Sequence, residues 1–139
     1  MRRIACEFVA LGVVILGGSQ LFAHHAFSAE FDAKQPIVLK GTVSKEEWIN
    51  PHAWVYIDVK DDAGKITTWA IECGAPNALL RRGWNRKDLP IGTEIVVDGY
   101  RAKDGSSTMN AANMTFPDGR KLFIGSTGTG APSDTQTPK

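Results

Sequence analysis

Cysteine, histidine and net charge are all scarce in this chain of 139 residues. It contains two cysteines and three histidines, and its formal net charge is +1 at pH 7. So little net charge argues against a nucleic-acid-binding protein, because such proteins usually carry a strongly basic surface. The sequence also lacks a glycine-rich phosphate loop, a nucleophile elbow and the helical histidine motif of metalloproteases. We therefore expect a protein that is not an enzyme.

The first 23 residues have the three-part pattern of an export signal. Two arginines follow Met1, residues 8–18 form an apolar run, and a polar stretch ends in the small residue Ala23. The apolar run is shorter than the roughly 20 residues that a membrane span requires. We expect cleavage of this signal peptide (residues 1–23) and a periplasmic or secreted mature protein without a membrane span. Cys73 is then the only cysteine, cannot form an intramolecular disulfide, and is interpreted as a buried apolar residue.

Alternating apolar and polar side chains predict a mainly β domain over residues 36–124. Pro76 near the start and Gly83 at the end predict one short helix over residues 75–82. Strands before and after such a helix are typical of a small OB-like antiparallel β-barrel, with a helix-free β-sandwich as the alternative. The expected strands cover residues 36–43, 52–59, 66–73, 93–100, 108–116 and 121–124.

The two flanks of this domain differ in composition. Residues 24–35 are interpreted as an N-terminal arm, and its two phenylalanines indicate that the arm docks on the domain. Residues 125–139 are rich in Gly, Ser, Thr and Pro and nearly free of apolar side chains. Such a segment buries too little apolar surface to offset its ordering entropy, so we predict a disordered tail.

Three motifs follow one another along the chain: His-His-Ala-Phe-Ser-Ala-Glu-Phe-Asp at 24–32, Leu-Lys-Gly-Thr-Val at 39–43, and Trp-Ile-Asn-Pro-His at 48–52. In this order they resemble a family of small secreted bacterial proteins that is classed only as a domain of unknown function. The likeness runs from about residue 24 to residue 124. It implies export and a small β-barrel, and it implies no activity.

The histidines suggest a copper site that depends on signal cleavage. If cleavage follows Ala23, the α-amine and the imidazole of His24 can chelate one metal ion. A third nitrogen from His25 or His52 would complete a site suited to Cu(II). Glu30 could add a ligand or orient a histidine, as could Asp32. The alternatives are solvated histidines on a frayed terminus and a purely structural His52.

Four aromatic residues suggest a second kind of site. OB folds often bind oligonucleotides or sugars by stacking on their first strands. A glycan, a peptide or a small ligand fits the near-neutral chain better than a nucleic acid. Some of these rings must also fill the core of so small a domain. The four residues are Trp48, Trp54, Tyr56 and Trp69.

These observations predict an exported binding or accessory module with an unidentified small ligand or protein as its partner. The first hypothesis is copper binding at His24, with His25 and His52 as further ligands. The second is a metal-free module that binds its ligand on the aromatic residues. A copper-dependent oxidative enzyme ranks below both hypotheses. The copper hypothesis in its three-histidine form requires His52 to lie within about 10 Å of the other two, since shared ligation needs bonds of ~2 Å.

Overall fold

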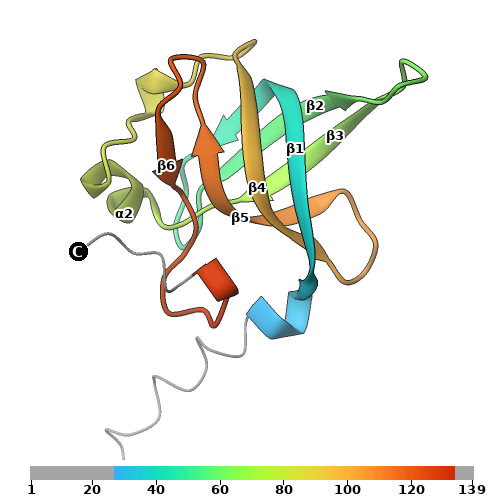
Figure 1. Cartoon of the computed structure of the whole chain (residues 1–139). Helices are drawn as coiled ribbons and strands as arrows, with labels where there is room; N and C mark the ends of the chain where they lie inside the picture. The colour runs from blue at the N-terminus through green and yellow to red at the C-terminus, as the bar shows by residue number, and fades with distance from the viewer. Residues whose placement is uncertain (1–26, 134–139) are drawn as a thin grey trace, which may run out of the picture.

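The computed structural model describes residues 27–133, which form a strongly curved β-sheet with short helices beside it (Figure 1). Residues 27–30 make a helical turn that leads directly into the first strand. The further elements are β1 (Phe31–Glu47), β2 (Trp54–Lys60), β3 (Ile66–Glu72), α2 (Pro76–Arg81), the 3-10 helix η1 (Arg86–Asp88), β4 (Glu94–Ala102), β5 (Thr108–Thr115) and β6 (Lys121–Phe123).

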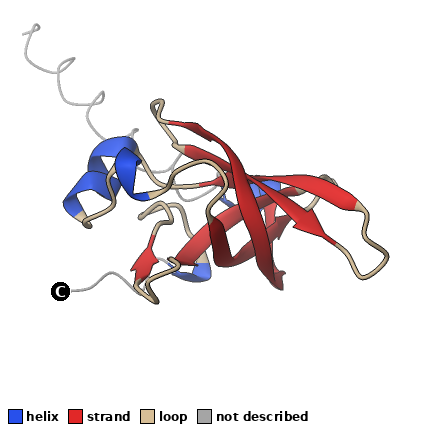
Figure 2. Cartoon of the chain, turned by 90° about the horizontal axis from the view of Figure 1, so that it is seen from above, coloured by secondary structure: helices blue, strands red, loops and turns tan. Residues whose placement is uncertain are grey.

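The strands pair in the order β3-β2-β1-β4-β5-β6. These neighbours are antiparallel, and β3 also pairs with β5 in a parallel arrangement. Strand β3 therefore has a partner on each side, through the register Ala70 to Thr108 and Glu72 to Asn110 on its second edge. Figure 2 shows how strongly the strands bend and twist to reach these partners. The prediction of a mainly β fold with a short helix between β3 and β4 is confirmed.

The main core lies on one face of the curved sheet, because apolar side chains recur at every second position of the strands. In β2, Val55 and Ile57 are buried, whereas the residues between them are partly exposed. The segment from α2 to η1 adds Leu79 and Trp84, both with no exposed surface, and so closes one end of this core. Cys73 is buried here as a free thiol, as the sequence predicts.

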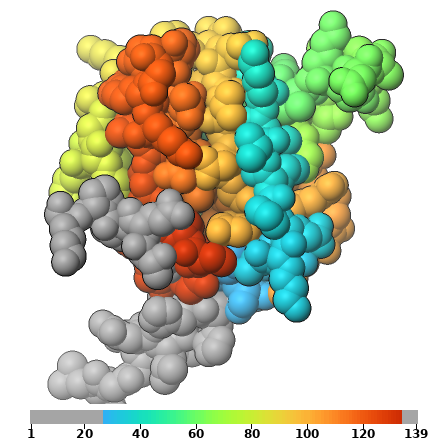
Figure 3. Space-filling view, viewed as in Figure 1, coloured from blue at the N-terminus to red at the C-terminus, as the bar shows by residue number. Residues whose placement is uncertain are grey.

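Both flanks of the domain contribute to a second, smaller apolar cluster. It consists of Phe27, Phe31, Ala102 and Ala131, with Tyr100 packed against it. Figure 3 shows the N-terminal turn and the C-terminal segment next to each other on the surface. The N-terminal arm thus docks on the sheet through its two phenylalanines, as expected.

The structure differs from the sequence predictions at both of these flanks. Strand β1 begins at Phe31, because that residue pairs with Ala102 of β4 before a register shift leads to Pro36. The segment 125–133 was predicted to be disordered, but Ala131 is 4% exposed and lies in the second cluster. These few apolar side chains are enough to order the segment, because Phe27 and Phe31 of the arm provide the apolar surface against which Ala131 packs.

Within residues 27–133, no helix is long and apolar enough to cross a membrane. The predicted signal peptide and the end of the predicted tail lie outside the described residues.

Candidate functional site around His52 and Glu72

A row of side chains crosses four strands on the face of the sheet opposite the main core. Trp54 of β2 pairs with Glu72 of β3, and Glu72 pairs in turn with Asn110 of β5. Asn110 also pairs with Tyr100 of β4. Residues paired across strands present their side chains on the same face. The chain neighbours of Trp54, Glu72 and Asn110 belong to the main core, so the row itself faces outward.

The N-terminal turn covers this outward row. The Phe27 ring packs edge-on against Tyr100, with ring centroids 5.4 Å apart, and stacks on Phe31 at 5.8 Å. The backbone N–H of Lys103 donates a hydrogen bond of 2.9 Å to the carbonyl oxygen of Glu30. The Lys103 ammonium also donates to the carbonyl oxygen of Ser28. These contacts place the turn over the sheet and bury the polar side chains beneath it.

Glu72 is the buried carboxylate of this site, with 7% of its surface exposed. Its Oε1 lies 2.8 Å from Nδ1 of His52. Burial and, to a smaller extent, the nearby carboxylate of Glu30 raise the pKa of Glu72 to about 7, although a hydrogen bond from Asn110 acts in the opposite direction. Burial also lowers the pKa of His52, although Glu30 partly opposes that shift. The surroundings therefore disfavour charge on both partners of the His52–Glu72 contact.

A small cavity of about 190 Å³ opens beside this contact. One wall comes from the N-terminal turn, with Phe27 and Glu30, and the opposite wall comes from the sheet. His52 reaches the cavity from the loop between β1 and β2, next to the cis peptide bond between Asn50 and Pro51. The cavity thus brings together the first described residues of the chain and its only described histidine.

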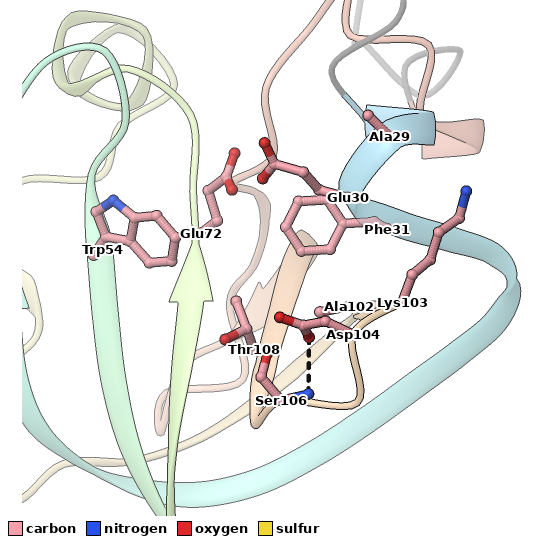
Figure 4. A pocket seen from close by; sticks show the side chains of 10 residues that line it. All are labelled: Ala29, Glu30, Phe31, Trp54, Glu72, Ala102, Lys103, Asp104, Ser106 and Thr108. Atoms are coloured by element: carbon pink, nitrogen blue, oxygen red, sulfur yellow. Dashed lines mark hydrogen bonds between the residues drawn. The ribbon is translucent and has the colours of Figure 1, made fainter.

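A larger cavity of about 520 Å³ adjoins the first and shares its central residues. Figure 4 shows Trp54 and Phe31 on opposite sides, with the carboxylates of Glu30 and Glu72 directed toward each other at one end. Residues of the β4–β5 turn form the other end, where Asp104 accepts a hydrogen bond of 2.8 Å from the backbone N–H of Ser106. Three acidic groups and two aromatic rings therefore border one space.

The structure places the sequence-predicted metal ligands in different regions. His52 lies at the smaller cavity, and Glu30 lines both cavities. His24 and His25 lie outside the described residues. Asp32 is used locally, because its carboxylate accepts hydrogen bonds from the backbone N–H of Lys34 at 2.9 Å and from the side chain of Gln35 at 3.0 Å. Within residues 27–133 there is no group of three or more His, Cys, Asp or Glu residues that could hold a metal ion.

The four predicted aromatic residues do not share one surface. Trp54 lines both cavities. Trp48 packs against Trp84, with ring centroids 5.1 Å apart, at the end of the core that α2 covers. Tyr56 donates a hydrogen bond of 2.9 Å to Glu47. Trp69 is a core residue, 8% exposed.

Glu72 and Asn110 are parts of the site that the sequence pattern did not reveal. Glu72 follows the apolar residues Trp69, Ala70 and Ile71 at the end of β3, and a carboxylate in such a place is rarely buried without a partner. This position was the signal available in the sequence. Its partner Asn110 comes from a strand 38 positions later, and the parallel β3–β5 pairing that joins them has no local sequence signature.

Among the comparisons with known proteins, only the comparison with family models gives a match. Comparison with curated proteins and with solved structures gives no significant match. A family model described as a family of unknown function, DUF6152, matches residues 12–111 and so covers most of the chain. The match includes the arm, β1 to β4, and the residues His52, Glu72 and Asn110. The chain belongs to this family of unknown function.

Proposed function

We propose that this chain is an exported OB-like binding module whose mature N-terminus binds a copper ion through His24, His25 and His52. The observation that carries the proposal is the position of His52. It lines the same small cavity as Phe27, the residue that follows His24 by three positions. The third candidate ligand thus lies close to Phe27, the first described residue of the arm that would supply the other two.

The reach of the chain supports this arrangement. Three residues span at most roughly 10 Å, so the backbone of His24 lies within that distance of Phe27. Phe27 is itself held in place, because its ring is 3% exposed and packed between neighbours. The length of the chain therefore allows the α-amine and imidazole of a mature His24 to reach the cavity that His52 lines.

The contact with Glu72 supports His52 as a ligand. Because Nδ1 of His52 faces the Glu72 carboxylate, Nε2 is the nitrogen directed elsewhere and available to a metal. A carboxylate behind a histidine in this way fixes the ring and increases the basicity of its other nitrogen, as in many metal sites. The copper ion would then be bound by nitrogen atoms of His24 and His25 in the arm and by Nε2 of His52.

Two further features support the rest of the proposal. The basic start, short apolar run and small residue at Ala23 support export, and cleavage there exposes the α-amine of His24. The double pairing of β3, with β2 on one edge and β5 on the other, supports the OB-like barrel because it joins the ends of a five-stranded run.

The test is a Cu(II) titration of the mature protein, whose first residue is established by mass spectrometry. We expect His24→Ala and His52→Ala each to weaken binding by at least about tenfold, because each removes a nitrogen ligand. A matched control adds three alanines before His24, which keeps every imidazole, moves the α-amine away and leaves no histidine among the first three residues. Full affinity in this extended protein, or in His24→Ala, would refute the N-terminal site.

A further inference from the structure

We propose that the larger cavity binds a small organic cation, namely an ammonium or guanidinium group carried on an apolar chain. The 520 Å³ cavity adjoins the smaller cavity of the proposed copper site and shares residues with it, but neither His52 nor Phe27 lines it. The proposal depends on three features of that cavity, which are its size, its rings and its charges.

The size and the walls suit a small molecule. Ligand sites are commonly 300–1,000 Å³ and mostly apolar, with a few polar groups that fix orientation. Here Trp54 and Phe31 stand on opposite sides of the space, and Ala102 also lines it (Figure 4). The Trp54 ring is half-buried, because β2 places it at the edge of the outward row. An apolar chain of a few carbons can therefore lie along the exposed part of the Trp54 ring.

The charges select a cation. The carboxyl groups of Glu30 and Glu72 are directed toward each other at one end of the cavity. Asp104 lines the far end, so acidic residues predominate in the cavity. The one basic residue, Lys103, donates its ammonium hydrogen to the backbone of Ser28. A cation placed beside Glu30 would form a charge-assisted hydrogen bond with its carboxylate.

The same features favour an organic cation over a bare metal ion. Within residues 27–133, the acidic groups and His52 are not arranged as a set of three metal ligands. Aromatic walls cannot replace the hydration shell of a small inorganic ion, so its transfer into this space would be costly. An ammonium or guanidinium group instead gains a cation–π contact with Trp54, while its apolar chain is removed from water.

The experiment measures binding of phenethylammonium to the mature, EDTA-treated protein by calorimetry, with neutral 2-phenylethanol as the matched ligand. We expect saturable binding of the ammonium that is at least about tenfold tighter than that of the alcohol, which corresponds to one charge-assisted interaction. Glu30→Gln should weaken ammonium binding by about tenfold and leave the alcohol unaffected. Glu30 is exposed, so this variant folds.

Two controls complete the experiment. Glu94→Gln removes an exposed carboxylate at the other end of β4, where it pairs with Lys40, and should bind the ammonium as the unaltered protein does. His24→Ala should also retain full ammonium binding, which separates this site from the copper site. Equal affinity for alcohol and ammonium, undiminished binding in Glu30→Gln, or the absence of saturable binding would each overturn the proposal.

Discussion

Nδ1 of His52 lies 2.8 Å from Oε1 of Glu72, and the Glu72 side chain is only 9% exposed. A carboxylate and an imidazole this close share one proton in either of two ways. Either a neutral histidine donates its N–H to a carboxylate, or a carboxylic acid donates its O–H to the ring nitrogen. Because burial opposes charge on both partners, this contact should make the stability of the fold depend on pH.

We predict that Glu72 lowers stability as the pH rises from about 4.5 to about 7. Its pKa is raised from 4.5 to about 7 in the folded protein, so the folded chain keeps a proton that the unfolded chain has already released. The full contribution is roughly 3 kcal/mol between these limits. Glu72→Gln keeps an oxygen acceptor for His52 and removes the titration, so its denaturant stability should exceed that of the unaltered protein more at pH 8 than at pH 5.

His52 contributes with the opposite sign. Burial lowers its pKa, so its contribution to stability is present above the ordinary value of 6.5 and is lost as the pH falls through the lowered folded value. Both the unaltered protein and Glu72→Gln contain His52. The difference between their stabilities at each pH therefore reports the titration of the Glu72 carboxyl group. Glu94→Gln, which alters an exposed carboxylate, serves as the control and should leave the pH profile unchanged. Parallel profiles for all three proteins would contradict the prediction.

We predict that Phe27→Ala releases the N-terminal turn while most of the sheet stays folded. The ring is 3% exposed and contacts Phe31 and Tyr100, so its removal costs about 3 kcal/mol of packing at the edge of the domain. Amide hydrogen exchange should become faster in the turn and the start of β1, whereas the exchange of β2 should change little. Phe27→Leu keeps most of the apolar volume and should have a much smaller effect; equal exchange in both variants would argue against docking by this ring.

The sequence predicts the strands of this fold better than their partners. The alternation of Val55 and Ile57 with exposed residues is a local signal and correctly predicts β2. The position of α2 is equally local, because proline begins it and Gly83, with φ of 90°, follows its last turn. The β3–β5 pairing depends instead on the whole set of sheet contacts, and no short pattern encodes it.

The candidate site shows the same division. His52 and Trp54 could be proposed from the sequence, because residue type alone made them candidates. Glu72 joins them only when β2 and β3 pair, since the register places it opposite Trp54. The sequence also cannot tell which aromatic residues belong to the core, because the alternation in β3 is compatible with either face. Trp69 is recognised as a core residue only from its burial in the folded protein.

We predict that Cys73 does not react with thiol reagents in the folded protein. Its side chain has no exposed surface, and burial raises its pKa, so the reactive thiolate hardly forms. Reaction with a chromogenic disulfide should be slow in buffer and rapid in concentrated denaturant, and its denaturant dependence should follow the unfolding curve. Rapid reaction of the folded mature protein would show that the segment after β3, which bears this residue, opens locally.

We predict that Gly99→Ala destabilises the domain by about 3 kcal/mol, because a methyl group there overpacks the sheet. A Cβ atom on Gly99 would lie 2.1 Å from the backbone oxygen of Asn110, at the register shift that joins β4 to β5. Since Asn110 also pairs with Glu72, the shift should disturb the candidate site as well as the sheet. Gly105→Asn is the control: its φ of 79° suits asparagine and no neighbour lies within 4 Å, so its loss should be small. Equal thermal midpoints for the two variants would mean that β4 and β5 separate readily to admit the methyl group.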